Sequence, residues 1–173
     1  GAKLLVKPGR YQEALELAAD VEIEGLGGPS DVWLMGTDDR PVVLVTDGNA
    51  SLRNLTISGG RRHDFHADVK GVSAVDVDRG ALVLHNVVFE DCPGACLSVT
   101  GKYAKVEARD CTFNVDHGYV IELSDAAGGL IEGCVLHGQA GASSPLVRFS
   151  GHQTDVVLRN CTLRRGGLLV QDN

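Results

Sequence analysis

The side chains best suited to chemistry are concentrated in one polar stretch, residues 58–71, with the sequence SGGRRHDFHADVKG. Carboxylates, imidazoles and guanidinium groups lie within a few residues of one another there, and such groups can transfer protons, pair with anions or bind a divalent metal. We interpret the stretch as a loop on a rigid scaffold, which is where binding and catalytic residues tend to lie. The candidate binding residues in it are Arg61, Arg62, His63 and His66, and Asp64 is a candidate catalytic residue.

Polar turns further along the chain carry side chains of the same types, including Asp91, Asp116 and His117. If these turns are stacked, Asp64, Asp91 and Asp116 come within the roughly 5–10 Å that separates the paired carboxylates of glycoside hydrolases. In a polysaccharide lyase, Arg61 could take the proton. The catalytic candidates are therefore Asp64, Asp91, Asp116, His117 and Arg61.

Metal binding is a second interpretation of the same residues. His63, His66 and His117 are ligand types that suit zinc. Their spacing forms no metal-binding motif, and solvated loop histidines explain them as well. We therefore predict no metal site and no cofactor.

A short repeated pattern must position these turns. Its copies are SLRNLTI (51–57), VLHNVVF (83–89), EARDCTF (107–113), IEGCVL (131–136) and LRNCTL (158–163), with a shorter echo, EIEGL (22–26). The residues at the aligned centre are Gly25, Asn54, Asn86, Asp110, Gly133 and Asn160, so successive copies are 29, 32, 24, 23 and 27 residues apart. Periods in this range indicate a solenoid, a propeller or an array.

The residues that follow each centre alternate between apolar and mixed positions, as in Leu55-Thr56-Ile57 and Cys111-Thr112-Phe113. A period of two indicates a strand with one buried face. A second apolar run precedes each centre, so we predict two strands per turn of a parallel β-helix. The residues directly after the centres then form one interior column, made of Leu55, Val87, Cys111, Cys134 and Cys161.

The segments PGRYQEAL, VEIEGLGG, LRNLTISGG and LRNCTL resemble the right-handed parallel β-helix family, which includes pectate lyases, polygalacturonases and many non-catalytic repeat proteins. The resemblance covers nearly the whole chain. It implies an all-β, single-stranded right-handed parallel β-helix of about six coils over residues 1–173. Fold alone does not imply an activity.

The resemblance favours a binding module over an enzyme. Polygalacturonase-like members carry Asn-Thr-Asp and Arg-Ile-Lys strands, and neither occurs here. We therefore expect a non-catalytic recognition or scaffold module of a larger protein, with a protein or polysaccharide partner. The alternative is a carbohydrate-active enzyme, a polysaccharide lyase or a glycoside hydrolase, that uses the loop residues.

A second candidate binding surface is the outward side of the strands. Arg53, Arg109 and Arg159 each come directly before the aligned centre of their copy, in one predicted outward column with Glu24, His85 and Glu132. Such flat faces can bind extended chains or partner proteins. We take these three arginines as further candidate binding residues.

Composition limits the class of partner and the location. A net charge of −7 argues against binding to nucleic acid or anionic membranes through bulk electrostatics. The chain contains no run of 18 apolar residues, so we predict no membrane span. Five cysteines are an odd number, so they cannot all be paired in a disulfide framework. We expect Cys111, Cys134 and Cys161 to pack as small buried hydrophobes. A disulfide within that column, or between Cys92 and Cys96, is the alternative.

An interior rich in thiols is typical of a reducing compartment, so we expect a cytoplasmic protein. The chain opens and closes in apolar runs without an amphipathic cap, and we expect it to be one domain cut from a longer protein. Near the start, the pattern predicts a turn over Lys7–Arg10 and a strand over Glu13–Leu17.

Overall fold

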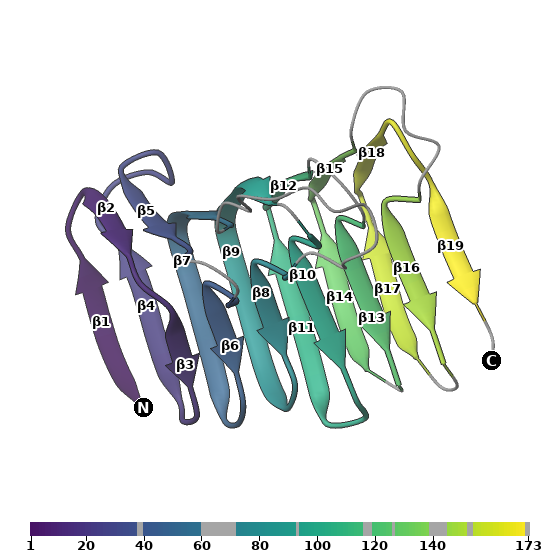
Figure 1. Ribbon diagram of the computed structural model, residues 1–173, viewed down its shortest axis with the longest axis horizontal. Coiled ribbons are helices and arrows are strands. Elements are labelled where there is room, and N and C mark those ends of the chain that lie inside the picture. Colours follow the sequence, from purple (N-terminus) through teal and green to yellow (C-terminus); the bar gives the residue numbers. More distant parts are fainter. Residues whose placement is uncertain are drawn as a thin grey trace.

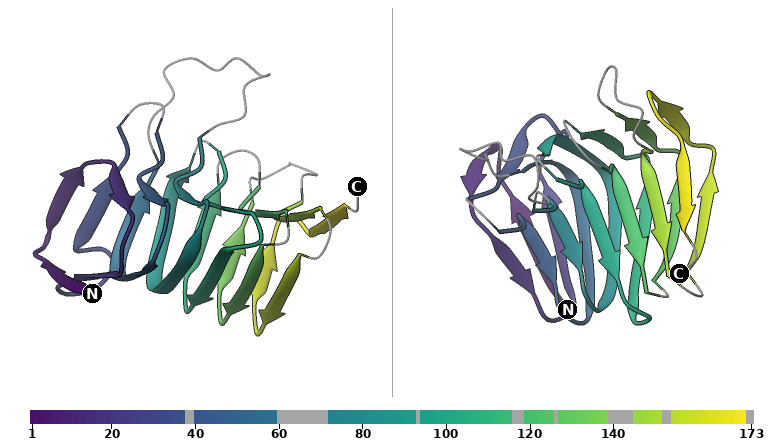
Figure 2. Two further views of the ribbon diagram at one scale, coloured as in Figure 1. Left: turned by 90° about the horizontal axis from the view of Figure 1, so that it is seen from below. Right: turned by 45° about the vertical axis from the view of Figure 1, so that its right-hand side comes forward.

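The computed structural model describes residues 1–37, 40–59, 72–92, 94–115, 119–125, 127–138, 145–151 and 154–171. The regular elements in these ranges are β-strands, and neighbouring strands pair in parallel along a solenoid (Figure 1). The two ends of the chain lie at opposite ends of the stack (Figure 2). Within the described ranges, no helix is long and apolar enough to cross a membrane.

Three faces run along the solenoid, and each turn contributes one strand to each face. Face 1 contains β1 (Ala2–Val6), β4 (Val21–Gly25), β11 (Ala104–Arg109), β14 (Gly128–Glu132), β17 (Asp155–Arg159) and the first parts of β7 (Asn49–Ser58) and β9 (Gly80–Cys92). Face 2 contains β2 (Gly9–Gln12), β5 (Val32–Met35), β12 (Thr112–Val115), β15 (Val135–His137), β18 (Thr162–Arg164) and the second parts of β7 and β9. Face 3 contains β3 (Leu15–Leu17), β6 (Val43–Val45), β8 (Val75–Val77), β10 (Leu97–Thr100), β13 (Ile121–Ser124), β16 (Val147–Ser150) and β19 (Leu168–Gln171).

The seven strands of face 3 correspond to six full turns of chain between β3 and β19, which confirms the predicted parallel β-helix of about six coils. The prediction of two strands per turn holds for the turns of β7 and β9, which run unbroken over faces 1 and 2, and is wrong for the other turns, which have three strands. A residue in the left-handed conformation bends the chain between faces 1 and 2. Asn54, Asn86, Asp110 and Asn160 each have a φ of 53°. Asparagine and aspartate tolerate this conformation because their short polar side chains can bond locally. The strand is interrupted at Asp110, Gly133 and Asn160, whereas β7 and β9 bend at Asn54 and Asn86 without a break.

The bends are also joined by a side-chain ladder. Nδ2 of Asn86 donates a hydrogen bond to Oδ1 of Asn54 at 2.8 Å. The side-chain amides of these two asparagines therefore stack between neighbouring turns.

Replacing Asn86 by alanine should destabilise the fold by about 1–3 kcal/mol, because it removes this hydrogen bond and places a β-carbon at positive φ. Urea denaturation followed by circular dichroism measures the change. Asn86→Gly is the matched control: it also removes the bond, but glycine adopts positive φ freely. A glycine variant as unstable as the alanine variant would show that the backbone conformation contributes nothing.

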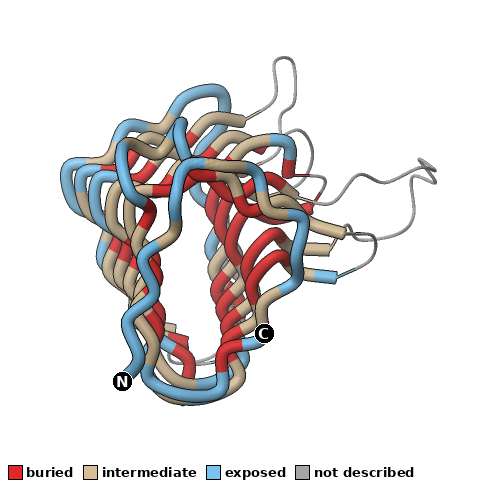
Figure 3. The backbone as a smooth tube through the Cα atoms, turned by 90° about the vertical axis from the view of Figure 1, so that its left-hand side faces the viewer, coloured by how far each residue is buried: buried red, intermediate tan, exposed pale blue. Residues whose placement is uncertain are grey.

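The interior is a set of stacked apolar columns. Viewed end-on, the turns lie in register and buried positions recur along the walls (Figure 3). Leu55 pairs with Val87, and both are fully buried. The amide of Cys111 donates to Sγ of Cys134 at 3.4 Å, and Cys161 packs against the same core. The predicted interior column is thereby confirmed.

The five cysteines are free thiols, so no disulfide forms within the column or between Cys92 and Cys96. The thiols donate weak hydrogen bonds to nearby carbonyl oxygens, for example from Sγ of Cys111 to Arg109 at 3.2 Å. Burial raises the pKa of the Cys161 thiol, which keeps it protonated at neutral pH. The prediction that these cysteines act as small buried hydrophobes agrees with this packing.

The first turn departs from its sequence prediction. Residues 9–12 form strand β2 instead of the second half of a turn, because they pair in parallel with β5. The bend is confined to the preceding residues, where the Tyr11 hydroxyl donates to the carbonyl oxygen of Lys7 at 2.9 Å. The next strand, β3, begins at Leu15 and not at Glu13. Pairing with β5 therefore overrides the local turn signal of Pro8-Gly9 at residues 9 and 10.

Candidate functional site

Most of the predicted loop candidates lie outside the described residues. These are Arg61, Arg62, His63, Asp64, His66, Asp116 and His117. Asp91 is described: it is exposed at the end of β9, with a φ of 50°. There the pairing of β9 with β12 shifts register, so the bulge turns Asp91 away from the ladder. The grouping of Asp64, Asp91 and Asp116 stays a prediction.

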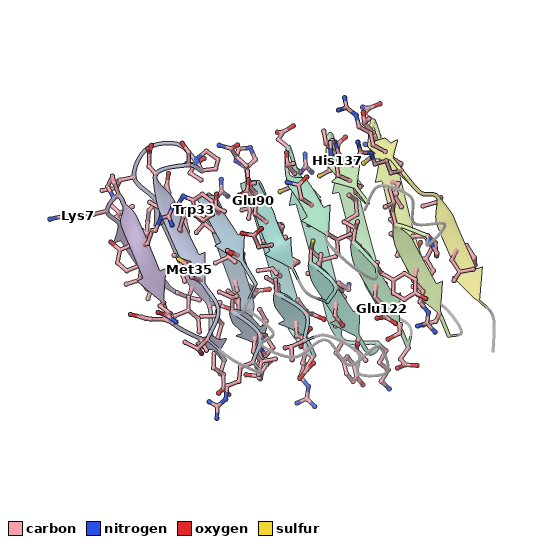
Figure 4. All side chains as sticks on the ribbon, turned by 45° about the horizontal axis from the view of Figure 1, so that its top comes forward. Lys7, Trp33, Met35, Glu90, Glu122 and His137 are labelled. Carbon is pink, nitrogen blue, oxygen red and sulfur yellow. The ribbon has the colours of Figure 1, made fainter. Side chains whose placement is uncertain are left out.

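The described ends of the loops do meet along one side of the solenoid, between faces 2 and 3. Backbone hydrogen bonds link equivalent loop ends of successive turns, from Cys96 to Val120 at 3.0 Å and from Val120 to Leu146 at 2.7 Å. On face 2, strand register aligns Met35 with Ser58 and Glu90, and it aligns Asn114 with His137. Glu122 lies apart from Met35, Glu90 and His137 (Figure 4). The stacked-turn geometry expected from the repeat therefore holds for these ends.

The three predicted arginines share one outward column on face 1. Strand register aligns Glu24, Arg53, His85, Arg109, Glu132 and Arg159 in that order. Arg109 contacts Glu107 at 2.6 Å and Glu132 at 3.1 Å. Arg159 contacts Glu132 at 3.4 Å, and Arg53 contacts Glu22 at 3.7 Å. Each arginine is thus paired with a carboxylate, and an anionic partner must compete with these ion pairs.

A shallow depression of about 460 Å³ lies beside this column on face 1. It exists because Gly128 carries no side chain between Lys105 and Asp155, its partners in the neighbouring strands. Val83, Leu130 and Val157 contribute apolar lining. A β-carbon at Gly128 would meet only ordinary contacts, the nearest at 3.6 Å, so a side chain can be added there without strain.

Face 3 carries a polar row that sequence reasoning missed. Register places Asp76, Ser98, Glu122 and Arg148 at consecutive outward positions of β8, β10, β13 and β16. Glu122 and Arg148 form an ion pair at 3.1 Å, and each side chain is only 22% exposed. The guanidinium of Arg148 also lies over the ring of Tyr119, 5.3 Å from its centre. Charge, aromatic surface and short polar side chains therefore meet on rigid strands.

Asp76 is the unusual member of this row. Its side chain is half-buried, and its Oδ1 is fully buried and has no hydrogen-bond partner within the described part of the chain. Burial raises the pKa of Asp76 to about 6, against a hydrogen bond with Ser73 that lowers it; Asp78 and Glu122 raise it further. A carboxyl with a perturbed pKa and an unsatisfied oxygen is a common mark of a functional site.

These residues were overlooked because each lies inside a short run that looks like a core strand, SAVDV for Asp76 and VIEL for Glu122. The sequence does carry a signal for them, because each acid interrupts an otherwise apolar strand at a position that points outward. Among the residues with described positions, no group of three or more His, Cys, Asp or Glu side chains could hold a metal ion.

Comparison with known protein families classifies the chain. The family model described as the right handed beta helix region matches residues 41–173. The chain belongs to the right-handed β-helix family. No curated protein matches it.

Among solved structures, this right-handed β-helix is similar to the tailspike protein gp49 from Acinetobacter baumannii bacteriophage Fri1, a capsular polysaccharide depolymerase. The TM-score is 0.65 at 13% sequence identity. The match covers 100% of this chain and 42% of the tailspike chain, so the β-helix spans less than half of that protein. At this identity, the likeness concerns the fold.

Proposed function

We propose that this right-handed β-helix is a recognition module for an extended polysaccharide, which binds on face 3. The observation that carries the proposal is the outward polar row of that face, in which Ser98, Glu122 and Arg148 stand in register. Neighbouring parallel strands are about 4.8 Å apart. Hydroxyl groups spaced along a sugar chain therefore meet donors and acceptors at regular intervals.

The surroundings of the row also suit a sugar. Ser124 Oγ lies 3.3 Å from Thr100 Oγ1 on the same side of the sheet, and such hydroxyls both donate and accept hydrogen bonds. The half-buried ring of Tyr119 offers a flat apolar surface for the C–H face of a pyranose. Binding sites with a few placed polar groups beside an aromatic ring favour ligands of mixed character.

Charge narrows the class of polysaccharide. The chain has a net charge of −7, and Asp76, Asp78 and Glu122 outnumber Arg148 on this part of face 3. A polyuronate would be repelled, so the favoured ligand is a neutral or amino-sugar polysaccharide. The capsular polysaccharide named for the similar tailspike supports a glycan over a protein partner.

The proposal is tested by calorimetric titration and an immobilised panel of dextran, galactomannan, N-acetylglucosamine oligosaccharides and polygalacturonate. We expect binding to a neutral or amino-sugar member and none to polygalacturonate. Ser98→Arg should weaken binding about tenfold or more, equivalent to about 1.4 kcal/mol, because its guanidinium fills the space between two carboxyls. Tyr119→Ala should weaken it through the lost stacking surface.

Two matched controls lie on face 1. Ser51→Arg makes the same change at an outward position of β7, and Gly128→Gln fills the depression. Neither should alter binding. The proposal would be contradicted if Ser98→Arg bound normally while these controls, or Arg53→Ala and Arg109→Ala, lost binding. That result would place the ligand on face 1.

A further inference from the structure

We propose that the depression on face 1 is a docking site for an extended segment of a partner protein, in which one acidic and one apolar side chain are separated by a single residue. The inference is independent of the polysaccharide proposed for face 3. The depression lies over β9, β11, β14 and β17, which pair side by side in that order (Figure 1). It is bordered by the arginine column of face 1 but does not depend on those arginines.

The apolar part of the site is a stripe of outward side chains. Register places Val83, Glu107, Leu130 and Val157 in one column across the four strands. Glu107 interrupts the stripe, but its carboxylate is bonded to Arg109 at 2.6 Å. In the first three turns the same column is polar, and Val157 at its far end is 45% exposed. Apolar side chains gathered on an exposed sheet face mark an interaction site.

The room for a partner side chain comes from the neighbouring outward column, which contains Ala81, Lys105, Gly128 and Asp155. Gly128 has no side chain and Ala81 has only a methyl group, so a volume of about 460 Å³ opens beside the stripe. Small-molecule sites enclose most of their ligand. A shallow depression covers one side only, so it suits a side chain whose parent segment makes further contacts on the surrounding sheet.

Two cations give the site its charge preference. Lys102 and Lys105 line the depression, and within the described part of the chain neither lies within ion-pair distance of a carboxylate. Lys102 lies over the ring of Tyr103, 4.7 Å from its centre. Asp155 is two strand spacings, about 10 Å, from Lys105, a distance at which salt screens repulsion between exposed charges. An acidic partner therefore gains attraction at these lysines without breaking an existing ion pair.

The distance between the two columns selects the sequence of the partner. Lys105 and Glu107 are two residues apart on β11, as are Gly128 and Leu130 on β14, so the columns lie about 6.5 Å apart. Side chains two residues apart on an extended peptide have the same spacing, whereas adjacent side chains point to opposite sides. A segment that runs along β14 therefore places an acid beside Lys105 and an apolar side chain beside Leu130. Because β14 is paired on both edges, the partner is held by its side chains.

The first experiment measures fluorescence polarisation of labelled peptides titrated with the wild-type chain. In one peptide a single serine separates glutamate from leucine, and in the other these two residues are adjacent. We expect saturable binding of the spaced peptide and binding at least about tenfold weaker for the adjacent one. Gly128→Gln fills the depression and should weaken the spaced peptide by about tenfold or more. Gly167→Gln is the matched control, because a β-carbon there meets nothing within 4 Å and lies outside the depression.

A charge exchange tests the contact with Lys105 directly. Lys105→Glu should weaken the glutamate peptide by about tenfold and strengthen a peptide that carries lysine in place of glutamate. Lys7→Glu is the matched control, since Lys7 is an exposed lysine outside the depression and should leave both peptides unchanged. Circular dichroism of each variant should match wild type. A Lys105→Glu variant that loses both peptides equally would contradict a direct ion pair.

The remaining outcomes separate this site from the other candidates. Docking on face 1 is overturned if no spaced peptide binds, or if it binds Gly128→Gln as tightly as wild type. Dimers of the wild-type chain that are lost in Gly128→Gln would make a second copy the occupant and would also overturn it. Polysaccharide binding is measured separately with Ser98→Arg, so failure of peptide docking leaves the proposed function standing, and the reverse is also true.

Discussion

Replacing Phe113 by alanine is expected to lower the free energy of unfolding by about 3–5 kcal/mol. Phe113 and Phe89 are fully buried, and their rings stack at 4.7 Å between centres with 14° between planes. They belong to an inward column of face 2 that continues through Ile57 and Leu136. The loss combines apolar area returned to water with a cavity that rigid neighbouring strands cannot close. Urea denaturation measures it.

Phe113→Leu is the matched control, since it keeps most of the volume and should cost about 1.5 kcal/mol or less. The double variant Phe89→Ala and Phe113→Ala should also be less destabilised than the sum of the single variants, by about 0.5–1.5 kcal/mol, because each single variant already removes the ring contact. An alanine variant within 1 kcal/mol of wild type would mean, on the scale of such substitutions, that the column repacks freely.

Replacing Asp76 by asparagine should stabilise the fold at pH 7 by about 2–3 kcal/mol. The folded-state pKa of Asp76 is raised to about 6, from a usual value of 3.8. A carboxyl whose pKa is raised on folding favours the folded state below the unfolded pKa, and this stability is lost as the pH rises through the folded pKa. Wild type should therefore lose stability relative to the asparagine variant between about pH 4 and pH 6.

The measurement is a pair of urea titrations, at pH 3.5 and pH 7, for wild type and variant. Comparing the two proteins isolates the contribution of Asp76 to the pH dependence of stability, since carboxyls that do not face Asp76 titrate equally in both. Glu24 is an example: contact with Lys3 lowers its pKa in wild type and variant alike. Glu16→Gln is the control, because Glu16 is exposed in the same outward column on β3, and a surface change of this kind should stay within about 0.5 kcal/mol. Equal stabilities of Asp76→Asn and wild type at pH 7 would contradict the prediction.

One oxygen of the Asp76 carboxyl is buried and has no hydrogen-bond partner among the described residues. A group of this kind destabilises the fold, and such costs are commonly kept where a site needs the group. A gain in the stability of Asp76→Asn together with weaker polysaccharide binding would make Asp76 a functional residue in a scaffold that is more stable without it.

The sequence was sufficient to predict the stacking of turns and the interior column from Leu55 to Cys161. Alternation with period two decides which side of a strand faces inward, and the recurrence of that pattern at a period of 23 to 32 residues decides which positions lie above one another. The outward alignment of Arg53, Arg109 and Arg159 followed from the same two facts. These features depend on local pattern, which the sequence carries directly.

Other features required the tertiary structure. The bends at Asp110 and Asn160 divide the predicted strands because a single residue at positive φ redirects the chain, and the apolar alternation in the sequence continues across it without a visible break. Pairing with β5 turned residues 9–12 into a strand against the local turn signal. The neighbours of Asp76 and Glu122 depend on the lengths of the intervening turns, which set the register of β8, β10 and β13. Only that register brings two acids from apolar runs to opposite sides of one serine. The burial that raises the pKa of Asp76 is likewise encoded by no local pattern.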